Sequence, residues 1–204
     1  MFDPNHPGRH WDARYGGEPT VYGTAPNVFF AVQLALLSPG RILLPGDGEG
    51  RNAVHAASQG WSVRSFDASP VGVEKALALA AARGVSIEAE VGRVEDWSPG
   101  APFDAIGLCY LHLPPALRAD FHPRVVDGLK PGGTLILEGF GPGQLALDSG
   151  GPKSLPMLFT TAMLEEDFAG LEVLECRTME VELDEGPYHQ GRAEVTRFVG
   201  RKPL

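Results

Sequence analysis

The chain has 204 residues, of which 43% are hydrophobic and 21% charged, with a formal net charge of −9 and a pI near 5.1. This length and composition predict one soluble globular domain, residues 1–204, and no apolar run is long enough to span a membrane. The acidic balance disfavours a nucleic-acid partner. We expect no metal site, no disulfide framework and no secretory signal, and therefore a cytoplasmic protein that is a monomer or a homodimer.

The predicted elements follow the chain in a regular alternation. Residues 1–24 are polar, aromatic and rich in Gly and Pro, and we expect them to form an irregular arm or lid in front of a core at residues 25–204. Strands are predicted at Ile42–Leu44, Trp61–Phe66, Val85–Val91, Phe103–Leu111, Thr134–Glu138, Leu171–Leu183 and Ala193–Gly200. Helices are predicted at Pro26–Leu37, Arg51–Gln59, Val71–Arg83, Pro114–Leu129 and Thr161–Phe168, with a turn at 130–133 and a loop at 139–157.

This order of elements predicts an α/β fold. Strands and helices alternate through residues 41–138, which is typical of βαβ units and a parallel sheet. Only a short turn at 184–191 joins the last two strands, so they should pair antiparallel.

The most informative motif follows the first predicted strand. Gly46, Gly48 and Gly50 alternate with other residues directly before the helix that begins at Arg51. Because glycine has no β-carbon, the turn can be tight and a ligand can approach the backbone closely. The N–H groups at the start of the helix point at the same place. The motif therefore predicts a loop that binds a nucleotide-type cofactor.

Asp67 is the second component of the predicted cofactor site. It ends the second strand, where a carboxylate can accept hydrogen bonds from both hydroxyls of a ribose. The alternative is a helix cap, since Asp67, Ser69 and Pro70 all suit the start of a helix.

Together these segments resemble the class I S-adenosylmethionine-dependent methyltransferases. Their motif I matches the G-x-G-x-G turn, and their L-x-P-G-G-x-L segment matches Leu129–Leu135. The chain is most similar to the small-molecule group that includes the tellurite-resistance and thiopurine methyltransferases. Trp11–Tyr15 with Tyr22 resembles the N-terminal arm of that group, and Tyr188–Arg192 resembles its C-terminal active-site segment.

The resemblance implies a Rossmann-like three-layer α/β/α domain and S-adenosylmethionine as the cofactor, with S-adenosylhomocysteine as the product. The sheet would have seven strands in the order 3-2-1-4-5-7-6, with the last strand antiparallel. The family usually has an acid at the position of Leu44, so Asp47 or backbone carbonyls would replace it. The expected cofactor contacts are Trp11, Tyr22, Gly46, Asp47, Gly48, Gly50, Asn52, Asp67, Ala68, Ser69, Val94, Glu95 and Cys109.

Three residues are candidates for catalysis. His112 and His189 could act as a base because histidine titrates near neutrality. Arg192 could bind an anionic acceptor through its guanidinium. The alternatives are a packing role for His112, an exposed turn for His189 and a surface cation at Arg192. Cys109 is expected to pack in the fourth strand as well as to lie near the cofactor.

The function that follows is methyl transfer to a small soluble acceptor, such as a thiol or a chalcogen oxyanion, by in-line displacement. One alternative is a protein that binds S-adenosylmethionine without catalysis, because Leu44 replaces the usual acid. A nicotinamide-dependent oxidoreductase is a further alternative, but the spacing of the glycines argues against it.

Overall fold

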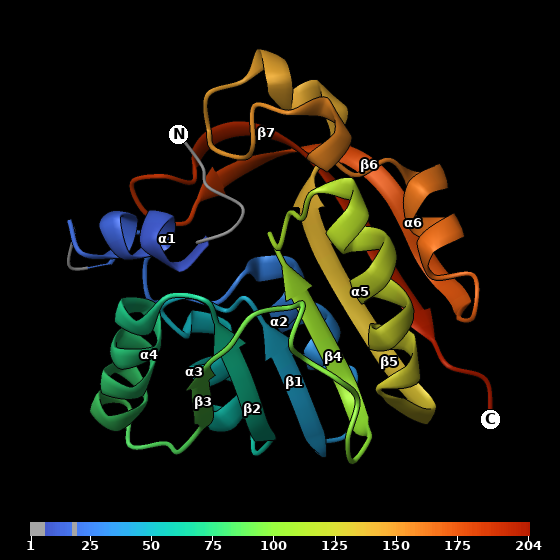
Figure 1. Cartoon of the computed structure of the whole chain (residues 1–204), viewed down its shortest axis with the longest axis horizontal. Coiled ribbons are helices and arrows are strands. Elements are labelled where there is room, and N and C mark those ends of the chain that lie inside the picture. The colour runs from blue at the N-terminus through green and yellow to red at the C-terminus, as the bar shows by residue number, and fades with distance from the viewer. Residues whose placement is uncertain (1–6, 18–19) are drawn as a thin grey trace. The chain divides into compact units, whose positions relative to one another are not determined.

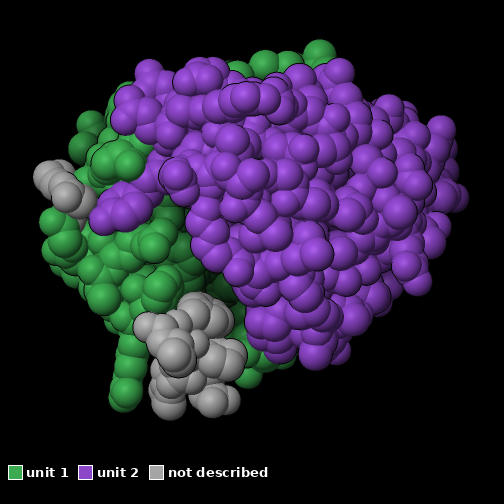
Figure 2. All heavy atoms as spheres, turned by 90° about the horizontal axis from the view of Figure 1, so that it is seen from above, with its two compact units in different colours: residues 1–97, 185–187 green, residues 98–184, 188–204 purple. Residues whose placement is uncertain are grey.

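The computed structural model describes residues 7–17 and 20–204. Its seven strands form one sheet in the order β3-β2-β1-β4-β5-β7-β6 (Figure 1). This order and the antiparallel last strand confirm the predicted fold class. The chain divides into two compact units, residues 1–97 with 185–187 and residues 98–184 with 188–204 (Figure 2). The prediction of a single domain over residues 1–204 stays a prediction.

Unit 1 contains the first half of the alternating pattern. Its parallel strands are β1 (Arg41–Pro45), β2 (Ser62–Asp67) and β3 (Glu88–Val91). Its helices after the N-terminal segment are α2 (Val28–Leu34), α3 (Arg51–Ser58) and α4 (Pro70–Ala82). Ile42, Leu43 and Leu44 of β1 are at most 1% exposed, as expected for a central parallel strand.

The N-terminal segment differs from its prediction. Instead of an irregular arm, it contains helix α1 (Pro7–Tyr15). Pro7 and Gly8 suggested a break, but proline is tolerated in the first turn of a helix, where its missing N–H has no partner to lose. An ideal β-carbon on Gly8 would lie 2.3 Å from the carbonyl oxygen of Ala68, so glycine lets the helix approach that backbone. Residues 1–6 and 18–19 of the predicted arm lie outside the described residues.

Unit 2 contains β4 (Phe103–Cys109), β5 (Leu129–Phe140), β6 (Glu172–Asp184) and β7 (Gln190–Arg201). β5 runs parallel to β4 and antiparallel to β7, which also pairs with β6. The helices are α5 (Pro115–Asp127) and α6 (Thr161–Asp167), with short 3-10 helices η1 (Pro142–Ala146) and η2 (Leu155–Met157).

Two boundaries in unit 2 differ from the prediction. The predicted turn at 130–133 belongs to β5, because Gly132 and Gly133 exchange backbone hydrogen bonds with Lys202 after β7. The predicted loop at 139–157 contains the last residues of β5 and both 3-10 helices. Gly and Pro in these segments suggested turns, but pairing with neighbouring segments organises the backbone instead.

Candidate functional site

The glycine turn joins the end of β1 to the start of α3. Gly46, Gly48 and Gly50 have φ angles of 63°, 56° and 80°, a region in which a residue with a β-carbon is strained. An ideal β-carbon on Gly48 would lie 2.4 Å from the Oη atom of Tyr15, and one on Gly50 would lie 2.5 Å from the β-carbon of Ala76. The turn therefore requires glycine for its conformation at all three positions, and for space at the second and third.

Asp67, at the end of β2, connects this turn to the start of α4. Its Oδ2 atom accepts a hydrogen bond from the backbone N–H of Gly48 at 2.9 Å, and its Oδ1 atom accepts one from Ser69 at 2.8 Å. Ser69 is the N-cap of α4, because its hydroxyl accepts a hydrogen bond from the backbone N–H of Gly72. Ser69 therefore has the capping role that was the alternative for Asp67. Burial raises the pKa of Asp67 to about 6, against the lowering effect of the two backbone hydrogen bonds.

Asp47 lies inside the glycine turn and contacts the first turn of α3. Its Oδ1 atom accepts from the Asn52 amide and its Oδ2 atom accepts from the backbone N–H of Ala53, both at 3.0 Å. Burial raises the pKa of Asp47 to about 7. Leu44, the position at which the resemblance implies an acid, is 1% exposed and packs in the core.

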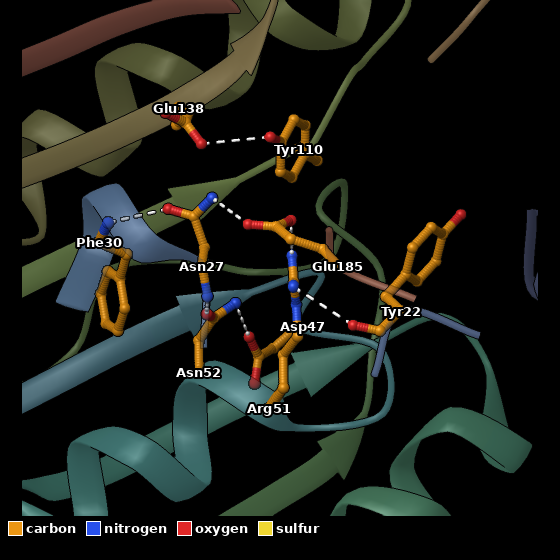
Figure 3. A network of polar contacts seen from close by, with 9 residues as sticks. All are labelled: Tyr22, Asn27, Phe30, Asp47, Arg51, Asn52, Tyr110, Glu138 and Glu185. Atoms are coloured by element: carbon orange, nitrogen blue, oxygen red, sulfur yellow. Dashed lines mark hydrogen bonds and ion pairs between the residues drawn. The ribbon is translucent and has the colours of Figure 1, made fainter. Parts of the chain in front are cut away.

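A buried polar network continues from Asn52 (Figure 3). The Asn52 side-chain oxygen accepts from the backbone N–H of Asn27 at 2.9 Å, and the Asn27 amide donates to Glu185 at 3.1 Å. Arg51 donates to the other Glu185 oxygen at 2.8 Å and to the carbonyl of Tyr22 at 3.3 Å. Asn27, Arg51 and Glu185 were not among the residues predicted from the sequence, where the one signal for this network is the charged residue Arg51 at the first position of α3.

The aromatic residues of the N-terminal segment form a cluster within unit 1. The rings of Trp11 and Tyr15 stack at 5.6 Å, and Tyr22 meets Tyr15 edge-on at 6.5 Å. Arg14 lies over the Trp11 ring and donates to the Tyr22 hydroxyl at 3.0 Å. Trp11 and Tyr22 thus both contact Tyr15, which packs against Gly48 of the glycine turn. Tyr15 was not among the predicted cofactor contacts.

Helix α1 also covers the two residues that follow Asp67. Asp12 accepts hydrogen bonds from the Ser69 hydroxyl at 2.5 Å and from the backbone N–H of Val71 at 3.3 Å. Gly8 lies against the Ala68 carbonyl. Ala68 and Ser69, both predicted cofactor contacts, therefore lie beneath α1 at the start of α4.

The segment after β3 holds the last predicted contacts of unit 1. Val94 is 9% exposed, and Glu95 forms an ion pair with Arg93. Trp97 stacks on Phe66 of β2 with ring centres 6.4 Å apart, which fixes this segment against the sheet.

In unit 2, both ring nitrogens of His112 bond to the backbone. Nδ1 lies 2.7 Å from the carbonyl oxygen of Met157, and Nε2 accepts from the N–H of Phe140 at 3.0 Å. The ring stacks between Phe140 and Phe159. Burial lowers the pKa of His112 to about 4, so the ring is neutral at neutral pH. This environment favours the packing role over that of a base.

His189 has a different environment, although the sequence suggested an exposed turn as its alternative. It is 5% exposed and meets the rings of Tyr110 and Phe140 edge-on at 4.4 and 5.2 Å. Among the described residues outside glycine, only Tyr110 has a positive φ, at 54°. Such strain in an aromatic residue is rare and clusters at functional sites.

Tyr110 is also part of a polar chain that the sequence analysis missed. Its hydroxyl donates to Glu138 at 3.2 Å, and Arg197 donates to the other Glu138 oxygen at 2.6 Å. Glu138 is 2% exposed, so its charge is buried and compensated by Arg197. Tyr110 directly follows Cys109, a predicted cofactor contact that is partly buried at the end of β4.

Arg192 lies on an exposed part of the β6–β7 hairpin. Its side chain is 63% exposed and donates two hydrogen bonds to the Glu180 carboxylate, from Nε to Oε2 at 3.0 Å and from Nη2 to Oε1 at 2.5 Å. Glu180 raises the pKa of Arg192 further. This environment favours the surface-cation alternative, and the role of Arg192 toward an anionic acceptor stays a prediction.

Neither a cluster of metal ligands nor a membrane-spanning helix is present among the described residues. No cluster of three or more His, Cys, Asp or Glu side chains in this part of the chain could hold a metal ion. No helix within residues 7–17 and 20–204 has the length and hydropathy to cross a membrane.

Comparison with known proteins supports the predicted chemistry. Residues 42–133 match a family model described as a methyltransferase domain. No curated protein matches the chain.

Several solved structures share the fold. One, described for the conversion of a disulfide bond into a thioacetal group during echinomycin biosynthesis, is 20% identical, with a TM-score of 0.78 over 97% of this chain and 92% of that chain. TehB from Haemophilus influenzae is 17% identical, with a TM-score of 0.73 over 88% of this chain and 63% of its own. The N-methyltransferase NodS from Bradyrhizobium japonicum WM9, in complex with S-adenosyl-l-homocysteine, is 13% identical. Its TM-score is 0.73 over 97% of this chain and 98% of its own.

The matched methyltransferase domain at residues 42–133, on the fold that these structures share, supports two predictions, namely S-adenosylmethionine-dependent methyl transfer and S-adenosylmethionine as the cofactor. The narrower likeness to the tellurite-resistance and thiopurine group remains a resemblance.

Proposed function

We propose that this protein methylates a small soluble acceptor, a thiol or a chalcogen oxyanion, with S-adenosylmethionine as the methyl donor. The observation that carries the proposal is the glycine turn with three positive φ angles, held to Asp67 by the N–H of Gly48. A turn of this kind admits a ligand close to the backbone, and the buried carboxylate can accept hydrogen bonds from ribose hydroxyls.

Residues of unit 1 are suited to bind the ribose of the cofactor and to exclude water from the glycine turn. Asp67 is the candidate for the ribose. Tyr15 and Trp11 are candidates for excluding water from the turn, since Tyr15 is only 4% exposed where it packs on Gly48. S-adenosylmethionine supplies a methyl group that is already activated by its sulfonium, so the protein mainly aligns the acceptor and excludes water.

The acceptor side of the proposal uses unit 2. Ligands of open α/β sheets bind beyond the carboxyl ends of the parallel strands, and Tyr110 lies directly after that end of β4. Its hydroxyl donates to Glu138, so the phenol oxygen can accept a hydrogen bond from an acceptor that carries a proton. His189, next to the Tyr110 ring, takes up the proton that a thiol loses. We assign this role to His189 because the backbone occupies both nitrogens of His112.

The acceptor class rests on chemistry and resemblance. Aromatic rings and the Met179 sulfur, which lies 3.2 Å from Arg197, offer a polarisable environment for a soft nucleophile. A sulfur acceptor is also consistent with the similar structure described for the conversion of a disulfide bond into a thioacetal group.

The test is turnover with a panel of small thiols, selenite and tellurite. We expect S-adenosylhomocysteine to form with at least one of them, above the rate without acceptor. Calorimetry should show one S-adenosylmethionine bound per chain. Binding without turnover on any acceptor would favour the non-catalytic alternative. A spectral shift of NADH on mixing, without S-adenosylmethionine binding, would favour the oxidoreductase.

A further inference from the structure

The glycine turn is surrounded by three carboxylates in unit 1, and each has a different partner. Glu49 is 6% exposed, forms an ion pair with Lys75 at 3.0 Å and accepts from the N–H of Val21 at 2.7 Å. Asp67 accepts two backbone N–H groups. Asp47 accepts from an amide and a backbone N–H, so both of its hydrogen-bond donors among the described residues are neutral.

Asp47 and Asp67 thus have only neutral donors among the described residues, and since Asp67 is the candidate for the ribose, Asp47 is the carboxylate left for a cationic ligand. A buried carboxylate is stabilised most by a hydrogen bond from a positively charged group. Arg51 lowers the pKa of Asp47 less than burial raises it, and the Arg51 guanidinium donates to Glu185 at 2.8 Å. Each Asp47 oxygen accepts one hydrogen bond from the chain, and a carboxylate oxygen can accept two.

The position of Asp47 is fixed by a relay of buried residues. The Asn52 amide donates to Asp47, Asn27 donates to Asn52, and Asn27 also donates to Glu185 (Figure 3). Asn27 and Asn52 are 0% and 3% exposed, so their amides have one arrangement that satisfies all these bonds. Glu185 stands at the end of the relay, where its second oxygen is held by Arg51.

We infer that Asp47 binds the α-ammonium group of the cofactor's amino-acid end, and that Glu185 positions it through Asn27 and Asn52. The inference rests on the proposed function, since it takes S-adenosylmethionine as the ligand. It assigns to the chain an acid for the ammonium although Leu44, buried and apolar, offers none. Glu185 acts only through the relay, so it is a positioning residue.

The experiment compares ligands that differ at the amino-acid end. S-adenosylhomocysteine carries the ammonium and the carboxylate, its decarboxylated analogue keeps only the ammonium, and 5′-methylthioadenosine has neither. Calorimetry on the full chain measures all three. We expect Asp47→Asn to weaken binding of the first two ligands by roughly ten- to a hundredfold. Binding of 5′-methylthioadenosine should stay within about twofold.

Glu185→Gln tests the relay without changing a ligand contact. It should weaken the two ammonium-bearing ligands several-fold and leave 5′-methylthioadenosine unchanged. Glu180→Gln is the matched control. Like Glu185, Glu180 is paired with an arginine, in this case Arg192, but its side chain is 57% exposed. It should change none of the affinities.

The outcomes separate the inference from the proposed function. If Asp47→Asn weakens all three ligands equally, Asp47 only caps α3 and the inference is wrong, while cofactor binding stands. An unchanged affinity for S-adenosylhomocysteine has the same consequence. If the wild-type chain binds none of the three ligands, the proposed function itself fails.

Discussion

The hydroxyl of Tyr15 lies against Gly48, at a point 2.4 Å from where a β-carbon on that glycine would be. Tyr15 is 4% exposed, and burial raises the pKa of its hydroxyl well above the ordinary value. The glycine turn is thus closed by an aromatic side chain of α1 as well as by its own backbone geometry. The space at Gly48 is used by the protein itself.

Replacing Gly48 with alanine should therefore destabilise the chain through contact with Tyr15. Gly84, with φ of 67° and no atom within 4 Å of its ideal β-carbon, is the matched control for backbone strain alone. We expect Gly48→Ala to cost about 1–3 kcal/mol more than Gly84→Ala in urea unfolding. In a Tyr15→Phe background, which lacks the hydroxyl, the excess should shrink. Equal costs for the two alanines would show that Tyr15 does not confine the turn.

Asp47 and Asp67 should contribute stability to the ligand-free chain that is lost as the pH rises from about 4 to about 7. Burial raises the pKa of Asp47 to about 7 and that of Asp67 to about 6, from an ordinary 3.8. The folded chain therefore keeps protons that the unfolded chain has lost, and deprotonation at higher pH costs folding free energy. Urea unfolding across this range measures the slope.

Asp47→Asn and Asp67→Asn should each remove part of this loss of stability, so that unfolding free energy falls less, or rises more, with pH than in the wild type. Asp120→Asn, at a carboxyl that is 65% exposed on α5, should leave this pH dependence unchanged. A slope that is the same in all three variants and the wild type would contradict the assignment to the glycine turn.

His112→Ala should lower stability without altering the pH profile of methyl transfer. The substitution leaves the Phe140 N–H and the Met157 carbonyl without the ring nitrogens that now bond to them, at about 1–3 kcal/mol for each buried group. The pKa of His112 is lowered to about 4, so its stabilisation is complete above pH 6.5 and is lost as the pH falls toward 4. Loss of turnover in a stably folded variant would restore His112 as a candidate base.

The glycine turn, the place of Asp67 at the end of β2 and the antiparallel last pair could be predicted because each depends on local sequence, whereas the strand order followed from the family resemblance. Alternating glycines after an apolar strand indicate one kind of turn, and the short link before β7 requires an antiparallel pair. Helix α1 could not be predicted, because Pro7 and Gly8 suggest a break unless the Ala68 carbonyl that Gly8 approaches is known.

The polar partners were harder to predict, since they join distant residues. Glu185 lies 134 positions from Arg51, and Tyr110 lies 28 positions from Glu138. A buried ion pair leaves no periodic pattern in the sequence, and a tyrosine with positive φ looks like any residue at a strand end. Tertiary contacts alone determine both.

His189 and Arg192 should differ in what they contribute to methyl transfer. His189 is buried against Tyr110, whereas Arg192 is exposed and paired with Glu180. With a thiol acceptor that supports turnover, His189→Ala should lower kcat about 10²-fold or more, as for loss of a general base. S-adenosylhomocysteine affinity should change little. Arg192→Ala and its matched partner Glu180→Ala should leave stability nearly unchanged, as for an exposed ion pair. If Arg192→Ala alone raises the KM of an anionic acceptor, Arg192 binds that acceptor after leaving Glu180. If His189→Ala retains wild-type turnover across the pH range, the proton is taken up elsewhere and the acceptor site beside Tyr110 is wrong.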